Sequence, residues 1–537
     1  MFLVNTLKNY LPLILIILLA SFLRLWMLDQ VPVAMSDDEI REIYTSYSIS
    51  QTGRDAFGNF MPLVIAMDGF STYGQVPIYG SSLLFLILPL NPFTGRLPHA
   101  ISGILSVLFF YFIIKKLFKN EMIAILSSAA LSVSVWHIQL SRFAIETNMT
   151  FLLYLIGICI FLYSKSVKAL ISSMVFFVLA FYSYSAFKVI FLPMIVILVW
   201  YRLKELTKEK LLIILATVIF AFSSFGILSI TQNAANYGGS PFFFSDKTKT
   251  SLNVEFERRA SDAPHFIENL YHNKYTYLTR MFLENYAGAF SPHYLFLNQE
   301  ASGIYSIWGR GELYFFESVF LLAGFLYMFL KKRKEFYFIL LLLLISPLPS
   351  ALGVGSPTWT SRSAFMIFPL YALLGFGIYS FINIFKDKRL KIFVSGLILI
   401  LYLYSVLGYT TQYYYDWSRT NAKYFSKSTK DLVYFINNSE KKEILVSGVT
   451  VNTFMHYAFY NKLDPNLVHS SINNNPIRFN NITFAKECLI GAASDPYKSI
   501  SENQIYIAAA GCRYKTKPKM QIKTYNGEEV MWNIYEK

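Results

Sequence analysis

Three consecutive acids, Asp37, Asp38 and Glu39, follow the first apolar segment of the chain by about ten residues. That spacing places them where a membrane-spanning segment would end and water begin. Charged side chains beside a bilayer are costly, and they are typical of chemistry or ion handling. A carboxylate in this position could take a proton from a hydroxyl group. A divalent metal ion held by Asp37, Asp38 and Glu39 is the alternative, and both interpretations stay open.

Further polar residues lie where apolar segments end on the same predicted side of the membrane. A carboxylate beside several cations suits a reaction in which a hydroxyl attacks and a phosphate departs. The cations that could bind this phosphate are Arg142, Lys188 and Arg362. The remaining candidates for the pocket are Asp37, Arg54, Asp55, His137, Glu146, Tyr184, His293 and Arg310.

Several of these residues have structural alternatives. Arg142 could be an interface residue, or it could pair with Glu146 at helical i,i+4 spacing. Arg54 and Asp55 could hold their loop together as an ion pair. Glu39 could orient the base or contact the acceptor, or it could be a solvated acid in the first turn of a helix.

The composition predicts an integral membrane protein. Of 537 residues, 54% are hydrophobic and 15% are charged, whereas about a quarter of the residues in a typical soluble domain are charged. The net charge of +15 would suggest nucleic acid as a partner in a soluble protein. Here the basic residues cluster in short segments between apolar ones, so nucleic-acid binding is not expected and membrane lipid is the predicted surrounding.

Apolar segments near the length of a spanning helix predict about eleven spans. With the N-terminus inside, every second connection is short and basic, as the positive-inside rule requires. The outer side then carries two long loops, 29–96 with the acids and 231–312. The stretch 80–93 is flanked by prolines and is predicted to be a helix at the membrane surface. The predicted spans are 9–28, 97–115, 121–137, 149–164, 169–186, 189–201, 211–230, 313–330, 336–348, 363–384 and 392–410.

The composition changes to polar residues after about 410. Strand-like runs at 443–447 and 504–508, helical apolar spacing at 431–437, and a hairpin at 520–535 around Asn526 and Gly527 predict a small α/β domain. Cys488 and Cys512 could form a disulfide if this region faces an oxidising compartment. We therefore predict an all-α polytopic membrane domain over 1–410 and an α/β domain over 411–537 on the outer face.

A series of short motifs resembles the signature of glycosyltransferase family 39. This family contains the dolichyl-phosphate-mannose protein mannosyltransferases, and the lipid A aminoarabinose transferases are related to it. The resemblance extends over most of 1–380 in order and spacing. The motifs are Asp38-Glu39-Ile40, Gly53-Arg54-Asp55, Pro77-Ile78-Tyr79, Gly95-Arg96-Leu97-Pro98, Trp136-His137-Ile138-Gln139-Leu140-Ser141-Arg142, Asn285-Tyr286, Gly311-Glu312-Leu313-Tyr314, Pro347-Leu348-Pro349-Ser350 and Ser361-Arg362.

The resemblance implies a GT-C fold with its active site on the outer face of a cell or plasma membrane. It implies transfer of a sugar from a polyprenyl-phosphate donor to an acceptor hydroxyl on a lipid, glycan or protein, usually with inversion. Asp38 matches the catalytic acid of the family and Glu39 matches the second acid, whereas Asp37 is an extra acid. The polar C-terminal domain departs from the protein mannosyltransferases, which carry an inserted module in the large loop, and this weakens protein as the assumed acceptor.

Two other functions remain as alternatives. A transporter or flippase would place ionisable residues within its spans and would show repeated halves. This sequence places its charges at span ends and has no evident repeat. An oligosaccharyltransferase or O-antigen ligase would share the membrane setting, but the order of the motifs argues against it.

Overall fold

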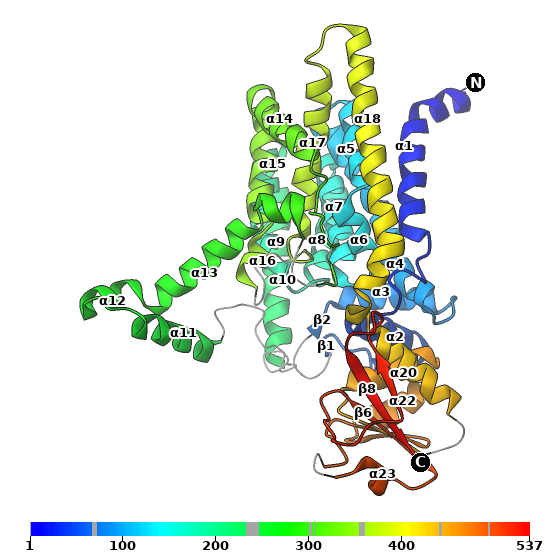
Figure 1. The fold of residues 1–537 in the computed structure, drawn as a ribbon. Helices are drawn as coiled ribbons and strands as arrows, with labels where there is room; N and C mark the ends of the chain where they lie inside the picture. The colour runs from blue at the N-terminus through cyan, green and yellow to red at the C-terminus, as the bar shows by residue number, and fades with distance from the viewer. Residues whose placement is uncertain are drawn as a thin grey trace.

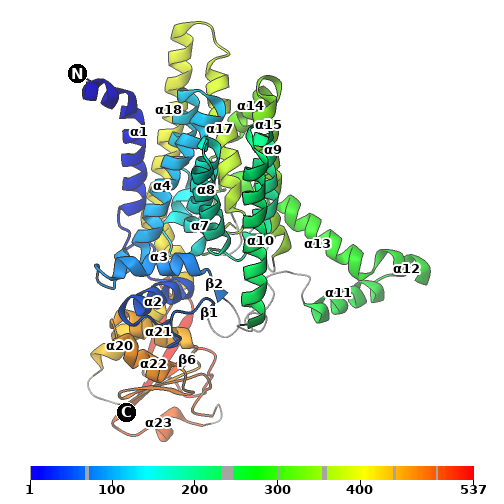
Figure 2. The same ribbon diagram turned by 180° about the vertical axis from the view of Figure 1, so that it is seen from behind.

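The computed structural model describes residues 2–66, 72–231, 246–299, 303–305, 307–353, 360–439, 443–491 and 494–537. Residues 232–245, in the predicted large outer loop, lie outside this description. Figure 1 shows a helical bundle with a sheet domain at one end and a helical arm at its side, and Figure 2 shows the same arrangement from behind.

Apolar helices build the bundle. Each of the eleven predicted spans contains one of them, except 121–137, which contains α5 and the start of α6. Six described helices are long and apolar enough to cross a membrane alone, or seven if α5 and α6 form one span across a bend of 59°. The bundle therefore confirms a helical membrane-type domain, while the number of spans stays a prediction. The helices are α1 (Phe2–Leu25), α4 (Pro92–Phe118), α5 (Glu121–Ser132), α6 (Val135–Ser141), α7 (Glu146–Tyr163), α8 (Val167–Phe181), α9 (Lys188–Arg202), α10 (Lys208–Thr231), α14 (Glu317–Lys331), α15 (Arg333–Ile345), α17 (Ile367–Ile382) and α18 (Lys388–Thr411).

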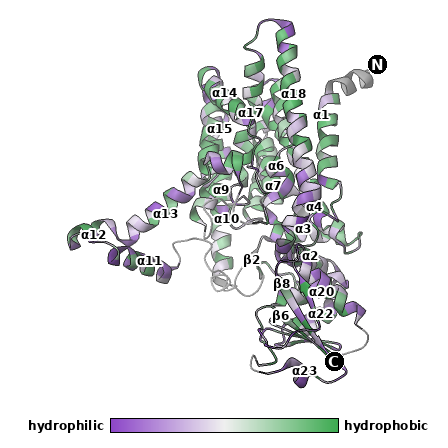
Figure 3. Ribbon diagram, in the orientation of Figure 1, coloured by the Kyte–Doolittle hydropathy of each residue, from purple (hydrophilic) through white to green (hydrophobic). Residues whose placement is uncertain are grey.

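Hydrophobic residues continue from the core of the bundle to its surface. Figure 3 shows the bundle largely hydrophobic and the sheet domain and arm more mixed. In the apolar windows of α10 and α18 only 11% and 6% of the residues are buried within the protein. We expect lipid to cover these surfaces, because contact between so large an apolar area and water would cost much free energy.

The loop 29–96, predicted to be the first outer loop, folds at the end of the bundle that faces the sheet domain (Figures 1 and 2). It contains α2 (Asp37–Thr52), β1 (Ile65–Ala66), β2 (Thr72–Tyr73) and α3 (Gln75–Phe85). Ser36 caps α2 in a capping box with Glu39. The predicted surface helix at 80–93 begins earlier and ends at Phe85, after which a turn leads to Pro92 and α4. Leu83, Leu86 and Ile87 are exposed, as expected for a helix against lipid.

The described part of 246–288 forms an arm that projects sideways from the bundle (Figure 1). It consists of α11 (Lys247–Arg259), α12 (His265–Tyr271) and α13 (Lys274–Gly288). The end of α13 is attached to the bundle, since the Tyr286 hydroxyl donates to the Leu344 carbonyl at 2.7 Å. Short turns complete the connections: η1 (Leu203–Glu205), η3 (His293–Leu297), α16 (Leu348–Leu352), η4 (Ala364–Met366), η5 (Gln412–Trp417), α19 (Ser418–Thr420) and η6 (Ala422–Phe425).

The C-terminal domain is built on a six-stranded mixed sheet in the order β4-β5-β3-β6-β8-β7. Its central strand β3 (Glu443–Ser447) is parallel to β5 (Ile482–Ala485) and β6 (Gln504–Ala509). The remaining strands are β4 (Ile477–Phe479), β7 (Met520–Lys523) and β8 (Val530–Glu536), and the helices are α20 (Lys427–Asn438), α21 (Val451–Tyr460), α22 (Pro465–Ile472) and α23 (Pro496–Ser499). The predicted strands, helix and hairpin are confirmed.

Two apolar cores show where the two parts of the chain meet. Tyr413, Trp417 and Phe425 belong to the core of the bundle, so the sheet domain begins only after them, with α20. The second core joins Ile40 and Tyr44 of α2 with side chains from both the helices and the sheet of the C-terminal domain. Helix α2 is therefore covered on one side by the C-terminal domain.

Candidate functional site

The first two turns of α2 present their charged side chains to two different domains. Asp37 and Arg41 are four residues apart and contact the C-terminal domain. Asp38 and Glu42 are also four residues apart, which places them together on another face of the helix. Glu42 reaches His99 of α4, within the bundle. Asp38 and Glu42 are therefore candidates for the functional site, whereas Asp37 and Arg41 attach α2 to the C-terminal domain.

A cluster of acids and a cation lies where α2 meets the bundle. The charges of Glu42, Asp38 and Lys188 all act on the carboxylate of Glu146, the first residue of α7. Glu146 also accepts a hydrogen bond from the backbone N–H of Gly74 at 2.6 Å. Lys188, the first residue of α9, is half-buried. We call Asp38, Glu42, Glu146 and Lys188 the acid–cation site.

The Glu42 carboxylate is buried with incomplete hydrogen bonding. His99 Nε2 lies 2.9 Å from Glu42 Oε1, and both side chains are buried. Neither carboxylate oxygen of Glu42 makes an aligned hydrogen bond with any residue that the structure describes. Leaving a buried carboxylate unsatisfied is costly, so such a group suggests a functional role.

Arg362 approaches the same region through Tyr184. The Tyr184 hydroxyl is hydrogen-bonded to Arg362 and to Ser361, and it also lies within reach of the Glu146 charge. The guanidinium of Arg362 packs directly against Gly353, where a Cβ would lie only 2.0 Å from Arg362 Nη1. Three of the predicted cations and polar residues, Lys188, Tyr184 and Arg362, thus gather around Glu146.

The Asp38 carboxylate is exposed, although much of its surroundings is protein. The surrounding protein keeps much of the water away from this carboxylate, and this desolvation raises the pKa of Asp38 above its ordinary range. The positive charge of Arg41 opposes this shift, and the nearby acids, Asp37 first among them, add to it. An accessible carboxylate with a raised pKa is a better proton acceptor than an ordinary aspartate.

Asp37 contacts the C-terminal domain through three hydrogen bonds. Its Oδ1 accepts from Ser426 Oγ at 2.9 Å and lies 3.0 Å from Nε2 of His456. Its Oδ2 accepts from Asn452 Nδ2 at 2.9 Å. Burial acts to raise the pKa of Asp37, but the hydrogen bonds and the charge of His456 outweigh it and hold the pKa well below the ordinary range.

Glu39 is fully buried and has a third set of partners. Arg96 donates to it from Nε at 2.8 Å and from Nη2 at 3.2 Å. The three consecutive carboxylates thus point to different partners, so one metal ion held by all three does not fit the structure. Within the described ranges, no group of three or more His, Cys, Asp or Glu side chains is arranged to hold a metal.

Arg142 organises the end of α1 instead of facing the site. Its two Nη atoms donate to five backbone carbonyls, those of Leu23, Arg24, Trp26, Met27 and Val31. Because these donors are occupied and the side chain is fully buried, its predicted role as a phosphate ligand does not fit. The predicted pairing with Glu146 is also wrong, because Arg142 follows α6 whereas Glu146 begins α7.

His137 lies in the core of the bundle. Arg24 Nη2 is 2.7 Å from its Nδ1, and the imidazole is buried. These contacts give His137 a structural role in the core of the bundle.

Arg54 and Asp55 hold their loop together through the backbone rather than through a mutual ion pair. The buried Asp55 accepts from the N–H groups of Phe57 and Asn59, and Arg54 Nη1 donates to the Gly58 carbonyl at 2.8 Å. These contacts give both residues a structural role in the loop between α2 and β1.

The two candidates from the large loop have partners outside the acid–cation site. His293 is exposed and contacts Asn298 within η3. Arg310 bonds to Gln412 and lines a cavity of about 660 Å³ beside the C-terminal end of α18.

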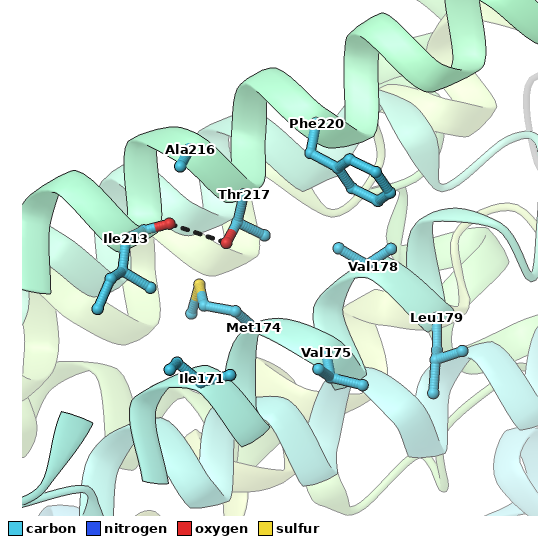
Figure 4. A pocket seen from close by; sticks show the side chains of 9 residues that line it. All are labelled: Ile171, Met174, Val175, Val178, Leu179, Ile213, Ala216, Thr217 and Phe220. Atoms are coloured by element: carbon cyan, nitrogen blue, oxygen red, sulfur yellow. Dashed lines mark hydrogen bonds between the residues drawn. The ribbon is translucent and has the colours of Figure 1, made fainter. Parts of the chain in front are cut away.

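An apolar groove between α8 and α10 leads toward the site. It has a volume of about 420 Å³, and Figure 4 shows its lining side chains, which come from these two helices. Beyond its end, Phe181 and Phe225 pack edge to face. Lys188 Nζ lies 4.2 Å from the ring centre of Phe225. These two rings therefore lie between the end of the lipid-facing groove and Lys188, a cation of the acid–cation site.

Sequence reasoning missed Glu42, His99 and the C-terminal residues that hold Asp37. Glu42 could have been found, because it stands one helical turn after Asp38. His456 and Asn452 carried no signal, since more than 400 residues separate them from their partner.

Residues 76–227 match the model of the family described as dolichyl-phosphate-mannose-protein mannosyltransferase. This range includes Glu146, Lys188 and the groove. No curated protein matches the chain.

Solved structures resemble nearly the whole chain. ArnT from Cupriavidus metallidurans, in the apo state and bound to undecaprenyl phosphate, matches with a TM-score of 0.51 and 11% identity over 97% of both chains. The oligosaccharyltransferase AglB from Archaeoglobus fulgidus matches with a TM-score of 0.48 and 12% identity over 84% of this chain. The chain spans 64% of the length of AglB. At these identities the ArnT match shows a shared fold.

Proposed function

We propose, from the premise that this chain is similar to glycosyltransferase family 39 and has the GT-C fold, that it is a membrane glycosyltransferase. It transfers a sugar from a polyprenyl-phosphate donor to an acceptor hydroxyl on the outer face. The observation that carries the proposal is the acid–cation site at the end of an apolar groove. The donor has three parts in the same order: its apolar tail would lie against the groove, its phosphate beside the cation, and its sugar beside the acid.

The donor would bind with its tail against the groove between α8 and α10. Lys188 lies beyond the aromatic end of this groove, where the phosphate would lie. Arg362 would be the second cation, since Tyr184 links it to the same cluster. Guanidinium and ammonium groups both bind phosphate oxygens, the former as a two-pronged fork.

The transfer would be a single displacement at the anomeric carbon. The acceptor oxygen forms a bond to this carbon while the bond from the carbon to the phosphate oxygen breaks. The acceptor proton passes to the Asp38 carboxylate, and the electron pair leaves with the lipid phosphate, which Lys188 and Arg362 stabilise. One displacement inverts the configuration of the sugar.

Glu39 would hold the base, Asp38, in position. It is held by Arg96 and caps the first turn of α2, so it fixes the position of Asp38 without touching the acceptor. Glu42 would add negative charge beside Asp38, which favours the protonated form of Asp38 after the transfer.

Two features support an outer location for this site. The basic connections predicted to lie inside include α14–α15 and α17–α18, and both are at the end of the bundle opposite the C-terminal domain (Figure 1). Cys488 and Cys512 form a disulfide in the C-terminal domain, and disulfides persist in oxidising compartments.

Reconstitution of the full chain in liposomes tests the proposed function. Undecaprenyl-phosphate and dolichyl-phosphate mannose, each with a labelled sugar, are supplied together with a lipid and protein extract as acceptor. We expect labelled product from at least one donor with the wild type, and a loss of roughly 10²- to 10⁴-fold with Asp38→Asn. Equal transfer by Asp38→Asn would remove Asp38 as the base. Solute flux without transfer from any polyprenyl-phosphate sugar would favour a transporter instead.

A further inference from the structure

The C-terminal domain contacts the first turn of α2 through two neighbouring side chains of one helix. Asn452 and His456 are four residues apart on α21, so they lie on one face. His456 Nε2 is 3.0 Å from Asp37 Oδ1, and Asn452 Nδ2 donates to Asp37 Oδ2 at 2.9 Å. Asn452 Oδ1 also accepts from Arg41 Nε at 2.6 Å. One helix thus holds both charged residues on that face of α2.

The contact is buried on the side of the C-terminal domain. His456 is 1% exposed and Asn452 is 7% exposed. Nε2 of the imidazole contacts Asp37, while Nδ1 is buried and has no hydrogen bond within the described part of the chain. Burying an unsatisfied ring nitrogen costs free energy, so the interaction at Nε2 has to compensate for it.

Two further contacts fix the chain just before the acids. Ser426, the residue before α20, donates to Asp37, and Lys430 Nζ donates to the Val33 carbonyl at 3.3 Å. The position of the α2 N-terminus is therefore determined from both α20 and α21.

Asp37 directly precedes Asp38 in the sequence, and Arg41 lies less than one helical turn after it. Any shift of Asp37 moves the backbone of Asp38, because the two are consecutive residues. A misplacement of a catalytic group by about 1 Å can cost about 100-fold in rate. The docking contact and the reactive carboxylate are thus mechanically linked.

We propose that His456 and Asn452 are positioning residues, through which the C-terminal domain holds the first turn of α2 so that Asp38 faces the donor. This proposal rests on the proposed glycosyltransferase function. It assigns the C-terminal domain a task in catalysis, and it makes Asp37 a docking residue rather than a second base.

A second interdomain histidine provides a matched control. His469 of α22 also contacts α2, with Nε2 3.0 Å from Ser48 Oγ. Ser48 lies ten positions after Asp38, near the other end of α2. His469→Ala therefore removes a similar interdomain contact at a distance from the reactive acid.

The kinetic test compares His456→Ala, His456→Gln and His469→Ala in the full chain, each in liposomes with the active donor. We expect His456→Ala to lower kcat roughly 10- to 100-fold with little change in the donor KM. His456→Gln, whose amide can donate to Asp37 in place of Nε2, should recover kcat to within about threefold of the wild type. His469→Ala should keep the wild-type kcat. Equal kcat values for His456→Ala and His469→Ala, or no recovery with His456→Gln, would overturn the proposal.

Hydrogen exchange provides a readout that does not depend on activity. The backbone amides of 37–42 should exchange faster in His456→Ala than in the wild type, and they should be unchanged in His469→Ala. Faster exchange without any transferase activity in the wild type would keep the docking role and reject the proposed function. Unchanged exchange at 37–42 in His456→Ala would reject the docking role itself.

Discussion

The guanidinium of Arg96 donates to both carboxylate oxygens of Glu39, and both side chains of this ion pair are fully buried. The same guanidinium donates to the carbonyls of Leu28, Pro32 and Ala34. Glu39 is thereby connected to the segment that leads from α1 into α2. Its neighbour Asp38 is exposed, so two adjacent acids have opposite environments and different tasks.

Removal of the Glu39 carboxylate should mainly lower stability. Glu39→Ala leaves the Arg96 guanidinium buried without its counter-charge, and breaking one side of a buried pair costs about 3–5 kcal/mol. We expect a clear drop in the thermal unfolding temperature of the purified protein in lipid nanodiscs. Glu205→Ala is the control, because the Arg202–Glu205 pair has an exposed acid and such pairs contribute only about 0–1 kcal/mol. An unchanged unfolding temperature in Glu39→Ala, together with lost transfer, would indicate direct contact with substrate instead.

Arg142 and Lys188 should respond differently to replacement. Arg142→Met leaves five backbone carbonyls without their donor, so it should reduce the amount of folded protein, because buried carbonyls left unpaired are costly. Lys188→Met removes a cation from the end of the groove and should raise the donor KM about tenfold or more, as expected for a lost charged contact. The measurements are donor titrations and thermal unfolding on both variants. A raised donor KM in folded Arg142→Met would return Arg142 to the phosphate site.

The rate of transfer should depend on the protonation of Asp38. Burial raises the pKa of this carboxylate, and only the deprotonated form can accept a proton, so kcat should fall as the pH is lowered through that pKa. Glu42 adds to the raised pKa through its negative charge. Glu42→Gln should therefore move the acid limb of the pH–kcat profile to lower pH. Glu121→Gln, at the start of α5, is the control and should leave the limb in place. A limb that moves to higher pH in Glu42→Gln would contradict the assignment of Asp38 as the base.

The same pKa shifts predict opposite effects on stability. The raised pKa of Asp38 means that its charged form disfavours folding above that pKa, so Asp38→Asn should unfold at a slightly higher temperature at pH 7. The lowered pKa of Asp37 means that its charged form favours folding above the unfolded value of 3.8, and this contribution is lost as the pH falls below it. Asp37→Asn should therefore be destabilising at pH 7. Thermal unfolding of the wild type and both variants between pH 3 and 8 checks the two signs.

The fold could be predicted from the sequence because its signals are local. Apolar length marks the helices of the bundle, and alternation with turn residues marks strands such as β3 and β8. The gathering of Asp38, Tyr184 and Lys188 around Glu146 also followed from local signals, since alternating spans bring every second connection to the same face. No knowledge of contacts between distant parts of the chain was needed to expect these residues on one face.

The tasks of individual charges could not be predicted, because they depend on partners far away in the chain. Arg142, Arg96 and Arg362 look alike in the sequence, since each is a basic residue near the end of an apolar segment. The first two, however, donate to backbone carbonyls in α1 or in the segment that follows it. Nothing near Arg142 in the sequence indicates those carbonyls, which belong to residues more than 100 positions earlier. The contact of Asp37 with α21 is invisible for the same reason.

The disulfide between Cys488 and Cys512 should protect the C-terminal domain and report its compartment. Its two cysteines are separated by 24 residues, and closing a loop of that length is worth about 3 kcal/mol. Cys488→Ser with Cys512→Ser should lower the stability of the domain by about that amount. In intact native membranes, a bulky maleimide should label neither cysteine of the wild type until a reductant is added, because a disulfide has no thiol to react. The third cysteine, Cys159, is buried in α7, and Cys159→Ala removes it from the count. Labelling of the Cys159→Ala protein without reductant would place the C-terminal domain, and with it the site on α2, in a reducing compartment, against the proposed outer location.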